Sequence, residues 1–361
     1  MADNYLENQY EAYLARKAAM AGKGKRVHKV AETLPERHDT YVPDTTEEEN
    51  DTVKALRELL GAASAEAGNC FREQLYDAAA LYAGYRPGQP DSARDCYDTR
   101  VYHRYLATGG NEAPLREQLA RTLHDYSQRR AMREFLSHYD ERRVVGIMGG
   151  HGLLRSDAMY RSVVEVSKRL TEQGFLMVSG GGPGAMEATH LGAWMAGRSE
   201  AELEQALQML LRAPSFRDRL WLETAFRVML EFPQERFASL GVPTWFYGHE
   251  PATPFATHIA KLFDNSLRED DLLTLAKGGI VYSPGSAGTM QEIFQDAVQN
   301  HYLSFGYASP MIFLGKRYWT EEMPVFPLMQ HLVKTGKYQN LILSLTDDVE
   351  EIVRQLQKFL E

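Results

Sequence analysis

A glycine-rich segment directly after a short apolar run carries the strongest chemical signal in the sequence. Residues 280–282 (IVY) have the composition of a buried strand, and residues 284–292 (PGSAGTMQE) follow as a tight turn and a helix start. Glycines let backbone amides converge on an anion, and a helix N-terminus adds partial positive charge. Glu292 falls in the first predicted helical turn, beside that anion site. The segment predicts a phosphate cradle with an adjacent acid, which suits chemistry on a phosphorylated sugar.

A purely structural interpretation of the same segment stays open. Thr289 at an N-cap and Glu292 three residues later match a capping box, in which the two side chains bond reciprocally to backbone amides. In the functional interpretation, Thr289 and the amides hold the phosphate while Glu292 faces the sugar. Gly285 and Gly288 favour the functional interpretation, because a plain cap does not require two glycines.

Two further glycine-rich segments follow apolar runs. Residues 144–148 (VVGIM) lead into 149–152 (GGHG), and residues 175–178 (FLMV) lead into 179–184 (SGGGPG). Ligands bind at the carboxyl ends of strands in open α/β sheets, so we expect all three loops to border one pocket. The residues expected to bind substrate are Gly149, Gly150, Ser179, Gly180, Gly181, Gly182, Gly285, Ser286, Ala287, Gly288 and Thr289.

Charged residues near these loops are candidates for catalysis. Glu187 begins the helix after the second loop, where it either faces the pocket or only complements the helix dipole. Arg268 either aims its guanidinium at a phosphate or a leaving base, or forms a surface salt bridge. The catalytic candidates are Glu292, Arg268 and Glu187. Four more side chains could line the pocket, although lone histidines are more often structural or exposed: His151, Tyr247, His249 and Glu250.

The elements that position these loops alternate between strands and helices from residue 143 onward. This order predicts an α/β fold, a Rossmann-like doubly wound parallel sheet with right-handed crossovers, over residues 141–361. Leucine spacing within 198–240 predicts a helical insertion, and residues 1–140 are expected to form a helical accessory or oligomerisation region. Further strands are expected at residues 242–247, 279–283, 311–314 and 341–345.

Composition narrows the possible classes of protein. The chain has 361 residues, of which 44% are apolar and 25% charged, which is typical of a globular protein. A net charge of −9 argues against general nucleic-acid binding, and we read the basic stretch 23–29 as a solvated segment rather than a nucleic-acid arm. Cys70 and Cys96 make neither a disulfide framework nor a zinc motif, and no segment reaches the roughly 20 apolar residues of a membrane helix. We therefore expect a cytoplasmic chain without a bound metal.

Other nucleotide-binding signatures fit less well. Gly180, Gly182 and Ala185 match the dinucleotide fingerprint, but its acidic residue should end a strand about 20 residues later. Residues 198–204 have the composition of a helix start instead, which disfavours a dinucleotide site. No P-loop lysine follows any glycine run and no nucleophile elbow is present, which argues against an NTPase or an α/β-hydrolase.

The motifs resemble those of a known family. Residues 179–182 with 284–292 are similar to the paired motifs of LOG ("lonely guy") phosphoribohydrolases, and residues 180–188 (GGGPGAMEA) resemble still more closely the bacterial pyrimidine/purine nucleotide 5′-monophosphate nucleosidases. The resemblance covers residues 142–361. It implies hydrolysis of the N-glycosidic bond of a nucleoside 5′-monophosphate to free base and ribose 5-phosphate, without a metal or redox cofactor. It also implies a homo-oligomer, a dimer or a tetramer.

The resemblance assigns roles to particular residues. Residues 285–289 would bind the phosphate, Glu292 would engage the ribose, and Arg268 would be the catalytic arginine. Ser286 replaces the second glycine of the family's Pro-Gly-Gly, and residues 265–269 (NSLRE) lack the His and Lys of its Met-His-x-Arg-Lys stretch. The alternatives are a non-enzymatic nucleotide or cofactor sensor or carrier of the same fold, and a pyridoxal-phosphate lysine decarboxylase. The latter would need Lys261 or Lys277, the lysines nearest the motifs.

Overall fold

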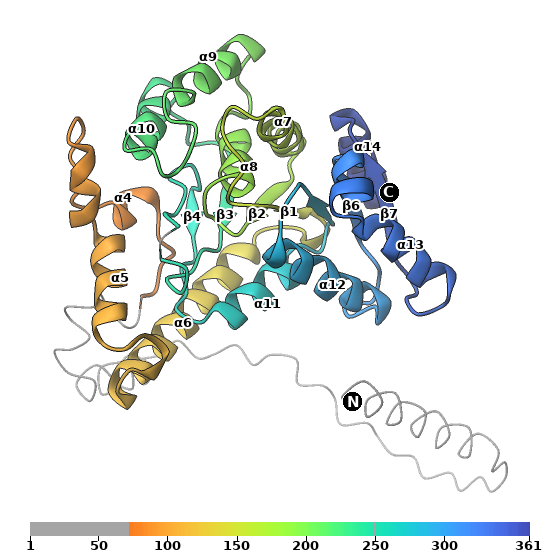
Figure 1. Cartoon of the computed structure of the whole chain (residues 1–361), viewed down its shortest axis with the longest axis horizontal. Helices are drawn as coiled ribbons and strands as arrows, with labels where there is room; N and C mark the ends of the chain where they lie inside the picture. Colours follow the sequence, from red (N-terminus) through yellow and green to blue (C-terminus); the bar gives the residue numbers. More distant parts are fainter. Residues whose placement is uncertain (1–71, 249) are drawn as a thin grey trace, which may run out of the picture. The chain divides into compact units, whose positions relative to one another are not determined.

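A seven-stranded, wholly parallel β-sheet forms the centre of the described chain (Figure 1). The computed structural model describes residues 72–248 and 250–361, which belong to the compact unit Thr52–Glu361. The strands are β1 (Val144–Met148), β2 (Leu176–Ser179), β3 (Ser239–Gly241), β4 (His258–Ile259), β5 (Ile280–Tyr282), β6 (Pro310–Leu314) and β7 (Ile342–Thr346). The basic stretch 23–29, Cys70 and His249 lie outside the described residues.

The strand order contains a topological switch point. The order is β4-β3-β2-β1-β5-β6-β7, so the chain runs outward from β1 to β4 and then returns to add β5 on the other side of β1. Loops leaving β1 and β5 therefore diverge in opposite directions and open a crevice at the carboxyl edge of the sheet. This is the Rossmann-like doubly wound α/β fold that the sequence predicts, and the structure confirms it.

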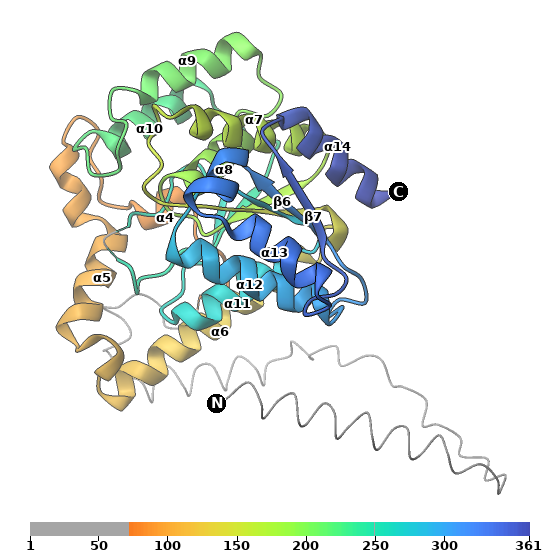
Figure 2. The same ribbon diagram turned by 45° about the vertical axis from the view of Figure 1, so that its right-hand side comes forward.

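Helices cover both faces of the sheet (Figures 1 and 2). One face packs against α7 (Ala158–Glu172), α8 (Ala185–Trp194) and α14 (Val349–Leu360), with α9 (Glu200–Leu210) and α10 (Trp221–Glu231) extending the same core. The other face packs against α6 (Leu115–Leu136), α11 (Asn265–Leu275), α12 (Ala287–His301) and α13 (Val325–Lys334). The expected helices within 198–240 are present as α9 and α10.

Side-chain alternation along the strands builds these two cores. Val145 and Ile147 of β1 point to the core on the α7 face, whereas Val144 and Met148 point to the opposite core. Every residue of β1 is buried, which explains the continuous apolar run in its sequence.

The strand predicted at residues 242–247 is wrong in its bounds. β3 occupies Ser239–Gly241, and its pairing with β2 ends where the Val242 N–H donates to the Ser179 carbonyl. Pro243 follows and has no N–H to continue the ladder. Residues 243–247 instead form a loop at the carboxyl edge of the sheet, in which Thr244 makes one isolated parallel bridge with Leu262. The two-residue strand β4 was too short to leave a periodic signal in the sequence.

The described residues before β1 are mainly helical. They include α4 (Ala78–Leu81), α5 (Tyr97–Ala107) and α6, together with the 3-10 turns Pro90–Asp95, Gly110–Glu112 and Glu141–Arg143. Tyr76, Leu81 and Val101 share an apolar cluster with Trp221 and Trp245. A domain boundary near residue 140 stays a prediction. In the part of the chain that the structure describes, no helix combines the length and the apolar character needed to cross a membrane.

Candidate functional site

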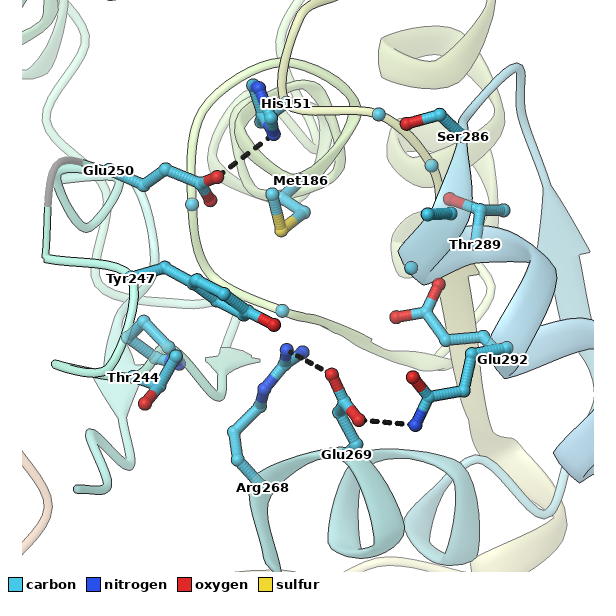
Figure 3. Close-up of a pocket in the computed structure, with 18 residues that line it drawn as sticks. His151, Met186, Thr244, Tyr247, Glu250, Arg268, Glu269, Ser286, Thr289 and Glu292 are labelled. Atoms are coloured by element: carbon cyan, nitrogen blue, oxygen red, sulfur yellow. Dashed lines mark hydrogen bonds and ion pairs between the residues drawn. The ribbon is translucent and has the colours of Figure 1, made fainter. Parts of the chain in front are cut away.

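A cavity of about 420 Å³ opens at the switch point of the sheet (Figure 3). Loops after β1, β2, β3 and β5 contribute to its wall, and α11 closes one side. The lining residues are Gly149, Gly150, His151, Gly180, Gly182, Met186, Pro243, Thr244, Tyr247, Glu250, Arg268, Glu269, Ser286, Ala287, Gly288, Thr289, Gln291 and Glu292. The three glycine-rich loops thus meet around one space.

The N-terminus of α12 presents unbonded amides to this cavity. Ser286 is the N-cap, and the first helical hydrogen bond is donated by the Met290 N–H to the Ser286 carbonyl. The N–H groups of Ala287, Gly288 and Thr289 have no acceptor among residues 72–248 and 250–361. Such amides, reinforced by the helix dipole, form an anion site. The helix begins earlier than a Thr289 cap would require, so the capping-box interpretation is wrong and Glu292 lies in the second turn.

Two hydrogen bonds hold the loop before α12 in place. The Gly150 N–H donates to the Pro284 carbonyl at 3.0 Å, and the Tyr318 hydroxyl donates to the Gly285 carbonyl at 2.6 Å. Tyr318 begins a π-helical turn, Tyr318–Glu322, that follows β6. A Cβ at Gly285 would approach the Thr289 hydroxyl to 2.2 Å, so glycine is needed there for close packing. The cradle is therefore held by one main-chain hydrogen bond, by the Tyr318 hydroxyl and by close packing at Gly285.

The second glycine loop is shaped by Met186 and by a buried polar network. A Cβ at Gly180 would lie 2.7 Å from the Met186 sulfur, and one at Gly182 would lie 2.8 Å from its methyl carbon. The Ser179 hydroxyl accepts from the Gly181 N–H and bonds to His190 Nε2 at 2.8 Å. Burial lowers the pKa of His190 to about 3, so its ring is neutral at physiological pH. Ser179 and Gly181 therefore support the loop without lining the cavity.

Glu292 presents a carboxylate to the cavity between the cradle and Arg268 (Figure 3). Burial raises the pKa of Glu292 to about 7; Arg268 opposes this shift and Glu269 adds to it. No hydrogen-bond donor within the described residues reaches this carboxylate. A carboxylate placed in this way is uncompensated by hydrogen bonds, and such groups are typical of functional sites.

Arg268 lies in the first turn of α11 and is held from one side. Its guanidinium donates to the Asn265 side-chain oxygen at 3.0 Å and to the Glu269 carboxylate at 3.3 Å, both through Nη2. Glu269 also accepts from the Gln291 amide. A Cβ at Gly180 would lie 3.4 Å from Arg268 Nη1, which places that nitrogen against the second glycine loop. The guanidinium is thus oriented and still borders the cavity.

The side of the cavity away from α12 carries a different set of groups. His151 Nδ1 lies 2.9 Å from a carboxylate oxygen of Glu250, so the first glycine loop is tied to the loop after β3. The Phe216 ring packs edge-on against the His151 ring at a centroid distance of 5.8 Å. Tyr247 and Thr244 complete this side (Figure 3).

Glu187 is not brought to the cavity. Its carboxylate accepts from Arg155 Nε at 2.9 Å and Nη2 at 2.5 Å, and from the Tyr160 hydroxyl at 3.0 Å. Both side chains of the ion pair are 1% exposed. Arg155 also donates to the Ala213 and Trp221 carbonyls and to the Thr224 hydroxyl. Through Arg155, the segment between the first glycine loop and α7 is therefore tied to α8 and α10.

Among the expected residues, the structure brings most of the glycines together with Glu292 and Arg268. Four are absent from the cavity wall: Ser179, Gly181, Gly285 and Glu187. Met186, Thr244, Glu269 and Gln291 line it without having been expected. The sequence signal that could have found three of them is position, because Met186, Glu269 and Gln291 each stand next to an expected residue in the chain. In the described residues, no group of three or more His, Cys, Asp or Glu side chains could hold a metal ion.

Comparisons with known proteins show likeness of fold. Neither a protein-family model nor a curated protein matches the sequence. The molybdenum cofactor binding protein of Rippkaea orientalis is 11% identical, with a TM-score of 0.38, over 60% of this chain and 97% of that one. The Moco carrier protein of Chlamydomonas reinhardtii is 15% identical, with a TM-score of 0.35, over 60% and 96%. These values are too low to bear on what this chain binds.

Proposed function

We propose that this chain hydrolyses the N-glycosidic bond of nucleoside 5′-monophosphates to free base and ribose 5-phosphate. The observation that carries the proposal is the Glu292 carboxylate, which borders the cavity one helical turn after the unbonded amides of α12. The phosphate binds those amides, and the ribose lies over Glu292 and Arg268. Breaking the glycosidic bond builds positive charge on the ribose ring, which an ionised carboxylate stabilises.

Each part of the cavity has a task in this reaction. The cradle binds the phosphate, which does not react, and its binding energy orients the distant glycosidic bond. Asn265 and Glu269 hold Arg268 in one orientation, from which it can contact the phosphate or the ribose. Glu292 supplies the negative charge where the cation develops.

The test is chromatography of free base released from a panel of ribonucleoside 5′-monophosphates, with the matching nucleosides run alongside. We expect release from one or more nucleotides and a rate about 10³-fold lower from the nucleosides, which lack the anchoring phosphate. Equal rates for the two classes would contradict a phosphate-anchored mechanism. Absence of release, together with a nucleotide-induced rise in melting temperature, would favour a nucleotide sensor or carrier.

Gly288 offers a direct test of the cradle. No atom lies within 4 Å of the position of a Cβ at Gly288, whereas one at Gly149 would approach the Ser283 hydroxyl to 1.9 Å. Gly288→Ala should therefore fold normally and place a methyl group in the cradle, raising KM for the nucleotide about 10-fold. Gly149→Ala should lower the melting temperature instead. An unchanged KM in Gly288→Ala, measured by initial rates, would contradict phosphate binding there.

The pH dependence of kcat/KM should report Glu292. The charged groups that shift its pKa are Arg268 and Glu269, and the pKa of about 7 predicts that kcat/KM rises with pH through that value as the carboxylate forms. Glu269→Gln removes a negative neighbour and should move the inflection to lower pH. The ionisation of the substrate phosphate, whose second pKa is about 6, should stay in place. If the inflection in the pH profile of kcat/KM stays in place in Glu269→Gln, it belongs to a group other than Glu292.

A further inference from the structure

The proposed hydrolysis leaves one chemical need unassigned, because the departing base must gain a proton. The phosphate end of the cavity is the N-terminus of α12, and Glu292 lies next to it on the same helix. A nucleotide anchored there directs its base toward the opposite side, where His151, Glu250, Tyr247 and Thr244 lie (Figure 3). The proton donor for the base must come from that side.

Among these groups, His151 has the side-chain type best matched to proton transfer near neutral pH. Arginine does not give up its proton in proteins, and hydroxyl groups such as that of Thr244 are too weakly acidic. Histidine exchanges its proton between pH 5 and 8, and a carboxylate bonded to one ring nitrogen fixes the tautomer and the orientation of the ring. His151 has such a partner, with Nδ1 at 2.9 Å from Glu250.

The surroundings of His151 support a fixed orientation. Phe216 packs edge-on against the ring, and Glu250 holds it from the loop after β3. Glu250 itself lies close to the second glycine loop, because its other carboxylate oxygen would be 3.5 Å from a Cβ at Gly182. His151 thus belongs to the first glycine loop, and its ring is positioned by Glu250 of the loop after β3 and by Phe216.

We propose that His151, oriented by Glu250, is the general acid that protonates the leaving base; this rests on the proposed function. The C1′–N bond breaks and its electron pair stays on the base nitrogen, which takes the proton of the imidazolium. Water adds its oxygen to C1′ and gives one proton to the Glu292 carboxylate. His151 then takes a proton from the solvent, and Glu292 releases its proton to the solvent.

The test compares two leaving groups that differ in their need for a proton. The substrates are the best natural nucleotide from the panel and 4-nitrophenyl β-D-ribofuranoside 5-phosphate, whose nitrophenolate is a stable anion. We expect His151→Gln to lower kcat about 10²-fold on the nucleotide and less than about 3-fold on the nitrophenyl substrate. Glu250→Gln, which alters a positioning residue, should show the same selectivity with a smaller loss. His138→Gln, at an exposed position outside the cavity, is the matched control.

The outcomes separate the two proposals. Equal losses on both substrates in His151→Gln would show that the ring has no acid role and would overturn this inference alone. No base release by the unaltered protein from any nucleotide would overturn the proposed hydrolysis, and the role of His151 with it. Melting temperatures of all variants verify that they are folded, and the ratio of the two rates is unaffected by the fraction of active protein.

Discussion

Replacing Glu292 by glutamine lowers kcat for base release by about 10³-fold while nucleotide binding stays within a few-fold of its original strength. The amide keeps the shape of the side chain and removes the charge that stabilises the ribosyl cation, a loss of about 4 kcal/mol in the transition state. Because the ground-state nucleotide carries no positive charge on the ribose, binding is spared. Single-turnover base release and isothermal titration measure the two quantities separately.

The same substitution has a signature in stability. The folded-state pKa of Glu292 is raised above its unfolded value, so the proton it holds stabilises the fold at low pH. That stabilisation is lost as pH rises through about 7. Glu292→Gln should therefore melt at a higher temperature than the unaltered protein at pH 8, with no advantage at pH 4. A higher melting temperature with a lower rate is expected where a site sacrifices stability for function.

Asp296 provides the matched control for both measurements. It lies one turn after Glu292 on α12, and burial raises its pKa to about 7 as well, although the Tyr282 hydroxyl bonds to it and opposes the shift. Asp296 does not line the cavity. Asp296→Asn should therefore change the pH dependence of stability and leave kcat within a few-fold. A 10³-fold loss in Asp296→Asn, or none in Glu292→Gln, would contradict the role given to Glu292.

Replacing Arg155 by methionine destabilises the fold by about 3–5 kcal/mol, because Glu187 is left buried without its partner. The side chains of this ion pair are 1% exposed and 2.5 Å apart at the closest atoms, and Tyr160 is the other donor to Glu187. Urea denaturation at pH 7 measures the loss as a lower midpoint with little change in slope. An Arg155→Met midpoint equal to that of the unaltered protein would contradict the stabilising role.

A double variant separates structure from catalysis at this pair. Arg155→Met with Glu187→Met replaces both charges by apolar groups of similar length, which is often neutral or stabilising for a buried pair. We expect the double variant to recover much of the lost stability and to keep a kcat within a few-fold of the original. A double variant that is stable but releases no base would restore Glu187 to the catalytic residues.

The contrast between Glu292 and Glu187 shows what could be predicted from sequence. Both follow a glycine-rich loop and both fall early in a helix, so the local pattern is the same. Which way each carboxylate points depends on contacts from elsewhere, and Arg155 captures Glu187 from 32 residues away in the chain. Nothing in the spacing of charged residues announces that pairing.

The fold was more predictable than the wall of the cavity. Alternating apolar runs and glycine loops are local signals, and they placed β1, β2, β5 and β6 within a residue or two. Residues 244–247 were mistaken for strand because their apolar character resembles one; beyond Val242 only Thr244 pairs, in a single isolated bridge with Leu262. Glu269 and Gln291 both line the cavity and are joined by a hydrogen bond between α11 and α12. Local sequence patterns do not predict such a contact between distant helices.

The two ends of the cavity differ in how readily they can change shape. At the α12 end, the wall includes the main-chain amides of residues 287–289, and the loop before the helix is held by the Tyr318 and Gly150 hydrogen bonds. At the opposite end, the wall includes the thioether of Met186 and the ring of Tyr247, which rotate about single bonds. The molecule therefore combines a rigid binding surface for the anion with an adaptable one for the aromatic group. It should be specific for the phosphate and should accept bases of different size.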